Sequence, residues 1–293
     1  MAAHKKSILR RMLSTESEWN PKVMMVRIVS RVFPDSVLHR AKKSYYAYLM
    51  KHTPEDWMER DSVIARLLIS SGDSVLDIGA NLGHYSRVLS RCVGPEGRVY
   101  AFEPIPQTFE FLSNNIRRLG LGNVELLNFA LSDTEKTTTM VIPTYRWGTE
   151  CWYDARVKTE KANPAWREIQ VTSERLDHFF DERGFTPPIT FVKCDANYHE
   201  LSVLRGGLRT LRASHPAMLI EVNPNPDDHT TTAFETFELL RAEGYSPYWF
   251  DGEELLPRKA GERSQNYFFL TPRHVSALAD YLESPVIQSS GKL

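Results

Sequence analysis

Residues 74–104 read SVLDIGANLGHYSRVLSRCVGPEGRVYAFEP and carry the strongest structural signal in the chain. The apolar run Val75–Ile78 predicts a short buried strand that ends at Gly79. A glycine-containing loop and a helical pattern follow, and a Gly-Pro-x-Gly turn leads into a second apolar run, Val99–Phe102, that ends at Glu103. Strand, helix and strand in this order predict a βαβ unit with a glycine-rich first turn.

The first turn and the end of the second strand predict a ligand that contains a ribose and an anionic group. Gly79 and Gly83 permit unusual backbone angles and let a ligand lie against bare backbone. The helix that follows directs its free N–H groups toward an anion. Glu103 stands 20 residues beyond Gly83, where a carboxylate at a strand end can accept hydrogen bonds from ribose hydroxyls.

Two residues favour S-adenosylmethionine over a dinucleotide. The dinucleotide fingerprint is G-x-G-x-x-G, but Asn81 occupies the position of the middle glycine, which normally lets a pyrophosphate approach. Asp77 fits poorly beside a diphosphate but suits a cationic amine, and S-adenosylmethionine has an amine, a carboxylate and a ribose. The alternative is an ordinary strand-to-helix turn that binds no ligand. The candidate cofactor contacts are Asp77, Gly79, Asn81, Gly83 and Glu103.

The composition is that of an ordinary globular protein with one large domain and an extension. The 293 residues are 42% hydrophobic and 25% charged, and the net charge of -1 gives no indication of nucleic-acid binding. The charge is uneven, because residues 1–51 contain eleven Lys or Arg and three Asp or Glu. The three cysteines, Cys92, Cys151 and Cys194, are far apart and predict reduced thiols. No secretory signal or long apolar run is present, so we expect a cytoplasmic protein.

Residues 1–70 are expected to form a helical extension outside the catalytic unit. Helical segments are predicted near 5–13, 22–33, 36–51 and 56–69, separated by proline-containing breaks. The segment near 22–33 has an apolar face and several basic residues, which suggests peripheral membrane contact or a lid over a negatively charged acceptor. The alternative is a helical cap that packs on the sheet. The expected division is 1–70, a methyltransferase domain over 71–273, and a tail over 274–293.

Strands and helices alternate from residue 74 to residue 250, which predicts an α/β fold with a mostly parallel sheet. Two segments at the end, 246–250 and 267–271, are expected to pair as antiparallel strands. Further strands are expected at 124–127, 189–194 and 218–222, and helices at 106–119, 173–183, 199–211 and 230–243.

A segment rich in aromatic residues, 145–166, interrupts this alternation. It is flanked by the strand-like stretches 137–142 and 168–172 and contains three tryptophans. Tryptophans are costly to leave exposed in a polar loop, so we expect the segment to fold over a pocket or another surface. It would then select the acceptor, or form a contact in a homodimer.

A second polar cluster is expected beside the glycine-containing turn at residues 79–83, called the cofactor turn below. Ligands of open α/β sheets bind above the carboxyl ends of the strands, where Asp195 and Glu221 end two of the predicted strands. His199 begins the next helix, whose N-terminus would lower its pKa and keep it neutral. Methyl transfer to a hydroxyl needs a base, and we expect Asp195 or His199 to be that base, with Glu221 nearby. A metal-assisted variant would use Asp195, Asn197 and Glu221 as oxygen ligands.

Several motifs along the chain resemble the FkbM family of S-adenosylmethionine-dependent methyltransferases. The resemblance covers roughly residues 70–225 and implies a Rossmann-like class I methyltransferase fold that usually methylates hydroxyls of sugars, lipids or natural products. It implies that Gly79, Asn81, Gly83 and Glu103 contact the cofactor, and that the backbone near Ala130 flanks its adenine. The motifs are DIGANLGHYS (77–86), AFEP (101–104), NFALSD (128–133), LD (176–177), VKCD (192–195), ELSVLRG (200–206) and IEV (220–222).

The run 195–200, DANYHE, departs from the family pattern, which typically reads Asp-Val-Glu-Gly after the fourth strand. Asn197 replaces a carboxylate, so a carboxylate role cannot be carried over to this position. Tyr198 replaces a glycine, which would narrow or re-line the acceptor pocket.

The expected function is transfer of a methyl group to a small-molecule, glycan or lipid-linked acceptor. The departure at 197–198 keeps open a rival function, a protein with this fold that binds its ligand without methylating and acts in assembly. An NAD-dependent oxidoreductase is a further alternative.

Overall fold

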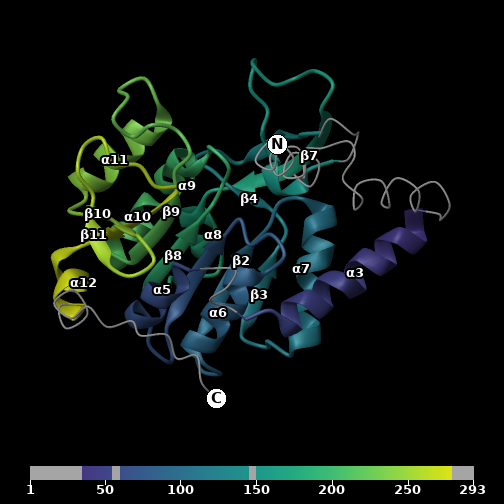
Figure 1. Cartoon of the computed structure of the whole chain (residues 1–293), viewed down its shortest axis with the longest axis horizontal. Helices are drawn as coiled ribbons and strands as arrows, with labels where there is room; N and C mark the ends of the chain where they lie inside the picture. The colour runs from purple at the N-terminus through teal and green to yellow at the C-terminus, as the bar shows by residue number, and fades with distance from the viewer. Residues whose placement is uncertain (1–34, 55–59, 145–149, 279–293) are drawn as a thin grey trace, which may run out of the picture.

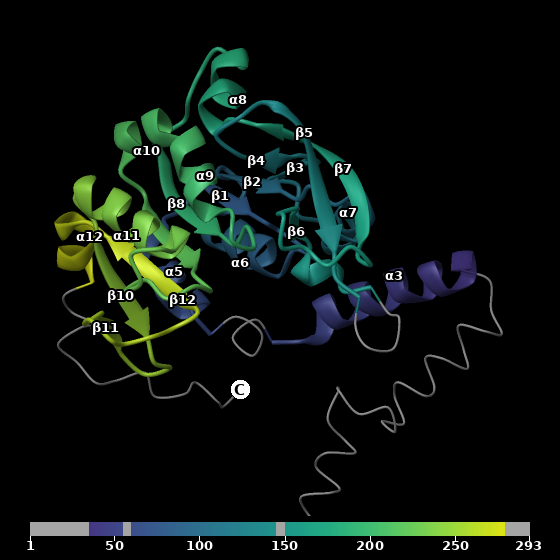
Figure 2. The same ribbon diagram turned by 90° about the horizontal axis from the view of Figure 1, so that it is seen from above.

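The computed structural model describes residues 35–54, 60–144 and 150–278. Within these residues the chain forms two sheets with helices around them (Figures 1 and 2). The larger sheet has the strand order β11-β10-β12-β9-β8-β1-β2-β3. Its strands are β1 (Ser74–Ile78), β2 (Arg98–Phe102), β3 (Val124–Leu127), β8 (Ile189–Cys194), β9 (Ala217–Glu221), β10 (Ser246–Phe250), β11 (Leu255–Pro257) and β12 (Asn266–Leu270).

The larger sheet is mostly parallel, as the alternation predicts. Neighbours from β3 to β9 all run parallel, whereas β12 is antiparallel to β9 and β10 is antiparallel to β12 and β11. The helices are α3 (Asp35–His52), α5 (Ser62–Leu68), α6 (His84–Val93), α7 (Pro106–Leu119), α8 (Leu176–Glu182), α9 (Glu200–Gly206), α10 (Leu208–Ser214), α11 (Thr232–Ala242) and α12 (Pro272–Ala277).

A smaller sheet stands at the carboxyl end of the parallel strands. It has the order β4-β7-β5-β6, and in Figure 1 β4 and β7 lie above the larger sheet. The two longer strands agree with the strand-like stretches that flank the aromatic segment. The short strands were not expected, because two residues hold too little pattern to predict. The bounds are β4 (Ala130–Leu131), β5 (Lys136–Ile142), β6 (Arg156–Val157) and β7 (Arg167–Glu174).

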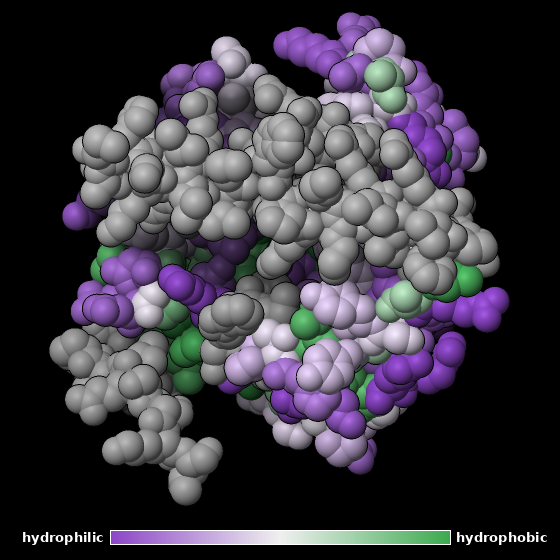
Figure 3. Space-filling view, turned by 45° about the vertical axis from the view of Figure 1, so that its right-hand side comes forward, coloured by the Kyte–Doolittle hydropathy of each residue, from purple (hydrophilic) through white to green (hydrophobic). Residues whose placement is uncertain are grey.

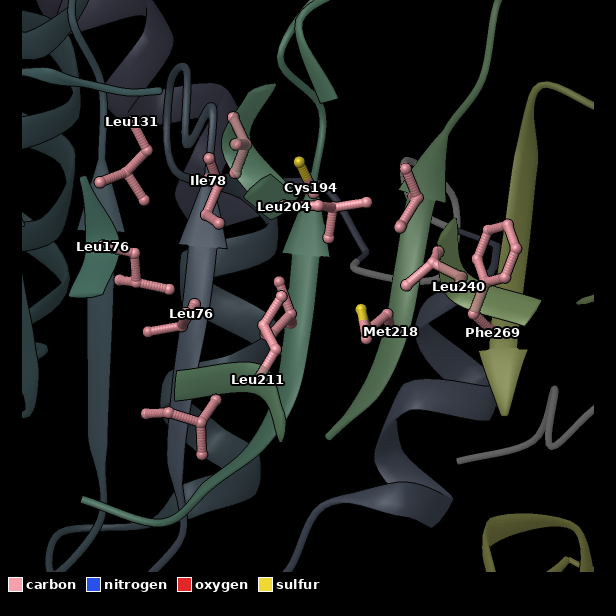
Figure 4. Packing of buried hydrophobic residues seen from close by; sticks show 14 of the residues in the cluster. Leu76, Ile78, Leu131, Leu176, Cys194, Leu204, Leu211, Met218, Leu240 and Phe269 are labelled. Carbon is pink, nitrogen blue, oxygen red and sulfur yellow. The ribbon is translucent and has the colours of Figure 1, made fainter. Parts of the chain in front are cut away.

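Both faces of the larger sheet are buried, which explains why its strands are continuous apolar runs. On one face, Leu76 and Ile78 of β1 pack with residues of β8, β9 and the helices α8–α11 (Figure 4). On the other face, Val75 packs with residues of α5, α6 and β12. The alternation along β1 therefore supplies both cores from one strand.

The predicted helix 199–211 is wrong in one respect, because the structure forms two helices that meet at Gly207. A Cβ atom at Gly207 would lie 2.8 Å from Leu176 Cδ2, so α8 packs directly against the break. The predicted helices 5–13 and 22–33 lie outside the described residues. The helix expected from residue 56 begins at Ser62 in the structure, and residues 55–59 are likewise outside the described ranges.

Helix α3 packs beside α7, as Figures 1 and 2 both show. Glu110 of α7 accepts hydrogen bonds from His39 Nε2 (2.9 Å) and Lys43 Nζ (2.7 Å). The Arg87 guanidinium of α6 donates to the backbone carbonyls of Met50 and Thr53. These bonds hold residues 35–54 on the outer helices, and the domain boundary at residue 70 stays a prediction.

Among the described residues that are visible in Figure 3, hydrophilic side chains predominate and hydrophobic ones appear in small separate areas. None of the helices in the described ranges is both long and apolar enough to cross a bilayer.

Candidate functional site

A pocket opens at the carboxyl ends of β1, β2 and β8 and extends under the smaller sheet. The space between its walls, including the open mouth, is about 670 Å³. Of the predicted site residues it brings together Gly79, Asn81, Glu103, Ala130, Asp195 and His199. Its other walls are Ile78, Phe102, Pro104, Ile105, Phe129, Leu131, Met140, Trp152, Tyr153, Ala155, Val157, Ala196, Asn197 and Val203.

Gly79 is required by the close approach of β1 and β8. Its φ is 78°, and a Cβ atom would lie 1.9 Å from the backbone oxygen of Asp195. The amide of Asp195 donates to the Ile78 carbonyl at 2.9 Å, which joins the two strand ends. The glycine therefore lets the cofactor turn and the second polar cluster meet.

Gly83 lies outside the pocket lining, and its expected contact with the cofactor stays a prediction. It is the N-cap of α6 with a φ of 92°, and a Cβ atom would lie 2.8 Å from Leu112 Cδ1 of α7. Its absence of a side chain allows α7 to pack against the turn, so its influence on the pocket is indirect.

Asn81 and Glu103 form the polar floor of the pocket. The backbone N–H of Asn81 donates to Glu103 Oε2 at 3.0 Å, and the backbone N–H of Ile105 donates to Glu103 Oε1 at 2.9 Å. Asn81 adopts a φ of 51°, which asparagine tolerates better than most residues. Its Oδ1 atom is buried and has no hydrogen-bond partner among the described residues. Because buried polar atoms are usually hydrogen-bonded, we expect this oxygen to accept a hydrogen bond from a ligand.

The Glu103 carboxylate is almost fully buried, and burial raises its pKa to about 7 despite the two backbone bonds. Hydroxyl donors from a bound ribose would offset that burial and favour the ionised form. The orphaned Asn81 oxygen suits the amine of the same ligand. The residues present therefore fit S-adenosylmethionine, which supplies an electrophilic methyl group when bound.

Asp77 is not brought into the pocket. Its side chain is 1% exposed, and its Oδ2 accepts a hydrogen bond from Ser86 Oγ at 2.5 Å. Burial raises its pKa to about 6. Asp77 thus anchors the first turn of α6 beneath the loop, and direct contact with a cofactor amine stays a prediction.

An apolar wall stands beside the floor. Ala130, the expected adenine neighbour, lies on it together with Phe129 and Ile105. The Phe129 ring is held edge-on to Phe102, with 5.4 Å between ring centroids. Phe129 and Ile105 were missed at the sequence level, although both are apolar residues placed just after predicted strand ends.

Asp195, Lys193 and Glu221 form a charged group at the ends of β8 and β9. Burial opposes ionisation of Asp195, but Lys193 Nζ at 3.3 Å from its Oδ2 and a hydrogen bond with Glu221 hold its pKa below the ordinary value. Burial and the neighbouring Asp195 raise the pKa of Glu221 to about 8. At neutral pH Asp195 is therefore ionised while Glu221 keeps its proton. Only Asp195 of this group lines the pocket.

His199 is the N-cap residue of α9 and faces the pocket. Burial lowers its pKa, so the ring is neutral as expected, but burial rather than the helix is the main cause. Its Nε2 lies 2.9 Å from Ser132 Oγ, and Ser132 Oγ donates to Asp133 Oδ1 at 3.3 Å. Which of these two atoms donates depends on the tautomer of His199: when the Ser132 proton goes to Asp133, Nε2–H donates to Ser132 and the lone pair of the ring lies on Nδ1.

The loop between β8 and α9 is held in an unusual conformation. Asn197 and Tyr198 both have positive φ, 48° and 74°. Glu200 Oε1 accepts hydrogen bonds from the amides of Ala196 (3.0 Å) and Tyr198 (3.2 Å), which stabilises this strained turn. The backbone keeps the left-handed conformation that a glycine would favour, although the side chain is a tyrosine.

The side-chain amide of Asn197 connects this loop to the aromatic segment. Nδ2 donates to the carbonyls of Tyr153 (3.0 Å) and Ala155 (3.1 Å). Trp152 and Tyr153 consequently form a wall of the pocket, so the expectation that this segment folds over a pocket is met for its described residues. Trp147 lies outside them. The described residues hold no group of three or more His, Cys, Asp or Glu side chains able to bind a metal ion.

The fold is the class I methyltransferase architecture, and one cavity holds the glycine-containing turn, the acidic strand end and the apolar wall. The model of the methyltransferase FkbM domain matches residues 77–247. The chain belongs to this family, and S-adenosylmethionine is its cofactor.

Curated relatives agree with this class. A hexuronic acid methyltransferase, AglP, from Haloferax volcanii is 29% identical over 202 residues, which cover 66% of this chain and 77% of the relative. A protein-L-isoaspartate O-methyltransferase from Ignicoccus hospitalis is 41% identical over 56 residues, but the match spans 19% of this chain and only 26% of that protein.

Among solved structures, an FkbM methyltransferase from Methylobacillus flagellatus is 19% identical, with a TM-score of 0.45. The match covers 70% of this chain and 45% of that one. An O-methyltransferase from Bacillus cereus in complex with SAH is 15% identical, with a TM-score of 0.44 and coverage of 83% and 94%.

Proposed function

We propose that this protein transfers the methyl group of S-adenosylmethionine to a hydroxyl of a sugar-containing acceptor, either a free glycan or a lipid-linked one. The observation that supports the proposal is that the predicted cofactor residues Gly79, Asn81 and Glu103 share one pocket with a neutral histidine, His199. The relationship to a hexuronic acid methyltransferase supports a sugar acceptor.

In this proposal His199 is the base that removes the hydroxyl proton. Its neutral ring, in the tautomer with the lone pair on Nδ1, is suited to accept a proton, and Ser132 and Asp133 stabilise the charged ring that results. Asp195 is a weaker candidate, because its bond to Lys193 lowers its basicity. Trp152 and Tyr153 cover the reacting groups and exclude water.

The test is methyl transfer from labelled S-adenosylmethionine to a panel of sugars, uronic acids and sugar phosphates, with wild type, His199→Gln and Asp195→Asn. We expect kcat to fall about 100-fold in His199→Gln, with cofactor affinity within about twofold of wild type. The rate of wild type should rise with pH through a value below 6.5 and then stay level, because the pKa of His199 is lowered.

Two results would count against the proposal. Full activity of His199→Gln together with an inactive Asp195→Asn would transfer the role of base to Asp195. Tight cofactor binding without turnover on any acceptor would favour the rival function, a protein that binds without methylating. Membrane contact through the basic N-terminal segment and formation of a homodimer stay predictions.

A further inference from the structure

Arg156 of β6 lies between two aromatic rings from other parts of the chain. Its guanidinium carbon is 5.0 Å from the centroid of the Trp166 ring and 5.5 Å from that of the Tyr198 ring. Trp166 precedes β7, whereas Tyr198 belongs to the strained loop after β8. Stacking of this kind fixes the plane of the guanidinium and leaves its N–H edge available for hydrogen bonds.

That N–H edge has no acceptor among the described residues. Arg156 Nε is buried and makes no hydrogen bond there, and no ion pair forms with its guanidinium within the described ranges. Two other arginines are paired: Arg167 of β7 with Glu150, and Arg183, which is stacked on Phe179, with Glu125. A buried, unpaired donor of a charged group is costly, so an acceptor from outside the chain would stabilise it.

The stack lies beside the pocket wall, and Arg156, Trp166 and Tyr198 are not among the residues that line the pocket. Ala155 and Val157, the neighbours of Arg156 in the chain, line the pocket, and so do the neighbours of Tyr198, Asn197 and His199. Because Asn197 bonds to the Ala155 carbonyl, the two segments that carry Arg156 and Tyr198 are joined directly. Because successive side chains of a strand point to opposite faces, Arg156 lies on the other side of this wall from Ala155 and Val157. An acceptor with one hydroxyl near His199 would therefore reach Arg156 with a second ring or substituent that extends beyond the pocket.

We propose that Arg156 binds an oxyanion of the acceptor and so selects an acidic saccharide. The chemistry is a planar or tetrahedral group with two oxygens that accept from the guanidinium fork, either the carboxylate of a sugar acid or the phosphate of a sugar phosphate. This inference rests on the proposed function, since it names the class of acceptor for the same site. Tyr198 in place of a small residue supplies one of the two rings.

Binding to the protein saturated with S-adenosylhomocysteine tests the inference without turnover. The probes are methyl glucuronoside, glucose 1-phosphate and the neutral methyl glucoside, measured by calorimetry. We expect wild type to bind one of the anionic probes at least about tenfold more tightly than the neutral one, and the better of the two identifies the oxyanion. In Arg156→Gln this preference should disappear, and Arg156→Lys, which keeps the charge without the fork, should be intermediate.

Arg183→Gln is the matched control, because it removes a stacked arginine whose guanidinium already has an acceptor within the protein, Glu125. It should keep the wild-type preference. Equal affinity of wild type for charged and neutral probes, or an unchanged preference in Arg156→Gln with normal cofactor affinity, would overturn the inference.

Turnover separates this inference from the proposed function. We expect Arg156→Gln to raise KM for the anionic acceptor about 10- to 100-fold with little change in kcat, and to leave KM for the neutral one within about twofold. If wild type binds an acidic sugar through Arg156 but methylates none, the proposed function fails and the anion site stands.

Discussion

The substitution Asn197→Asp tests whether one amide holds the aromatic segment over the pocket. Asparagine and aspartate both tolerate a left-handed backbone, so the change alters the donor group and not the turn. The Asn197 side chain donates two hydrogen bonds, to the carbonyls of Tyr153 and Ala155. Aspartate has no donor and would face those two carbonyl oxygens with a negative charge.

The magnitude follows from the two lost bonds. Each is worth about 1 kcal/mol, and leaving partly buried acceptors without donors adds a further penalty, so docking of residues 151–157 should weaken by about 3 kcal/mol. A change of that size makes opening of the segment about 100-fold more frequent. The amide of Lys158, which donates to the Thr139 carbonyl at the end of the segment, is a direct reporter.

Hydrogen exchange of residues 150–158 measures this opening. We expect faster exchange there in Asn197→Asp, a raised KM for the acceptor and nearly unchanged cofactor affinity, because the cofactor residues belong to other loops. Asn163→Asp is the control, since Asn163 uses its oxygen to accept from the Ala165 amide and aspartate keeps that bond. Equal exchange in Asn197→Asp and wild type would refute the reasoning.

Two further predictions concern the cofactor side of the pocket. Gly79→Ala should lower the free energy of unfolding, measured in urea, by more than about 3 kcal/mol, because the added Cβ would clash with the Asp195 carbonyl. Gly120→Ala is the control: its φ is similar and the space around it is open, so it should cost about 1 kcal/mol. Similar losses of stability in the two variants would contradict this prediction. Burial raises the pKa of Glu103 from 4.5 to about 7 and that of Glu221 to about 8, so the folded state holds these protons more tightly than the unfolded one. Without cofactor, the free energy of unfolding should fall as the pH rises from 6.5 to 8.5, by about 1 kcal/mol from Glu103 alone. A rise over this range would contradict the prediction. The buried histidines, whose pKa is lowered, have the opposite effect on stability, mainly below pH 6.5.

Most of the larger sheet could be predicted because each strand is a continuous apolar run bounded by turn residues. The bounds expected for α7, β3 and β8 agree with the structure. The break at Gly207 was missed, since an isolated glycine within a helical pattern does not show what packs against it, and here Leu176 of α8 does. Short strands such as β4 and β6 depend on their partners and have no pattern of their own.

The cofactor half of the site was determined by the sequence itself. Gly79, Asn81 and Glu103 belong to one βαβ unit of about 30 residues, so chain connectivity alone brings the turn and the acidic strand end together. The same pattern does not show that the Asp77 side chain is buried against Ser86 or that α7 packs on Gly83, because both contacts depend on packing, and the predicted cofactor contacts of these two residues stay predictions.

The acceptor half was decided only by the tertiary structure. The bond between Ser132 and His199, the clamp from Asn197 to the aromatic segment and the stack of Arg156 on Tyr198 each join residues about 40 or more positions apart. No local pattern specifies such contacts, because their geometry depends on how two sheets and a strained loop pack together. The stretch 74–104 therefore predicts which cofactor binds, whereas the packing around residues 195–200 forms the part of the pocket where we propose that the acceptor binds.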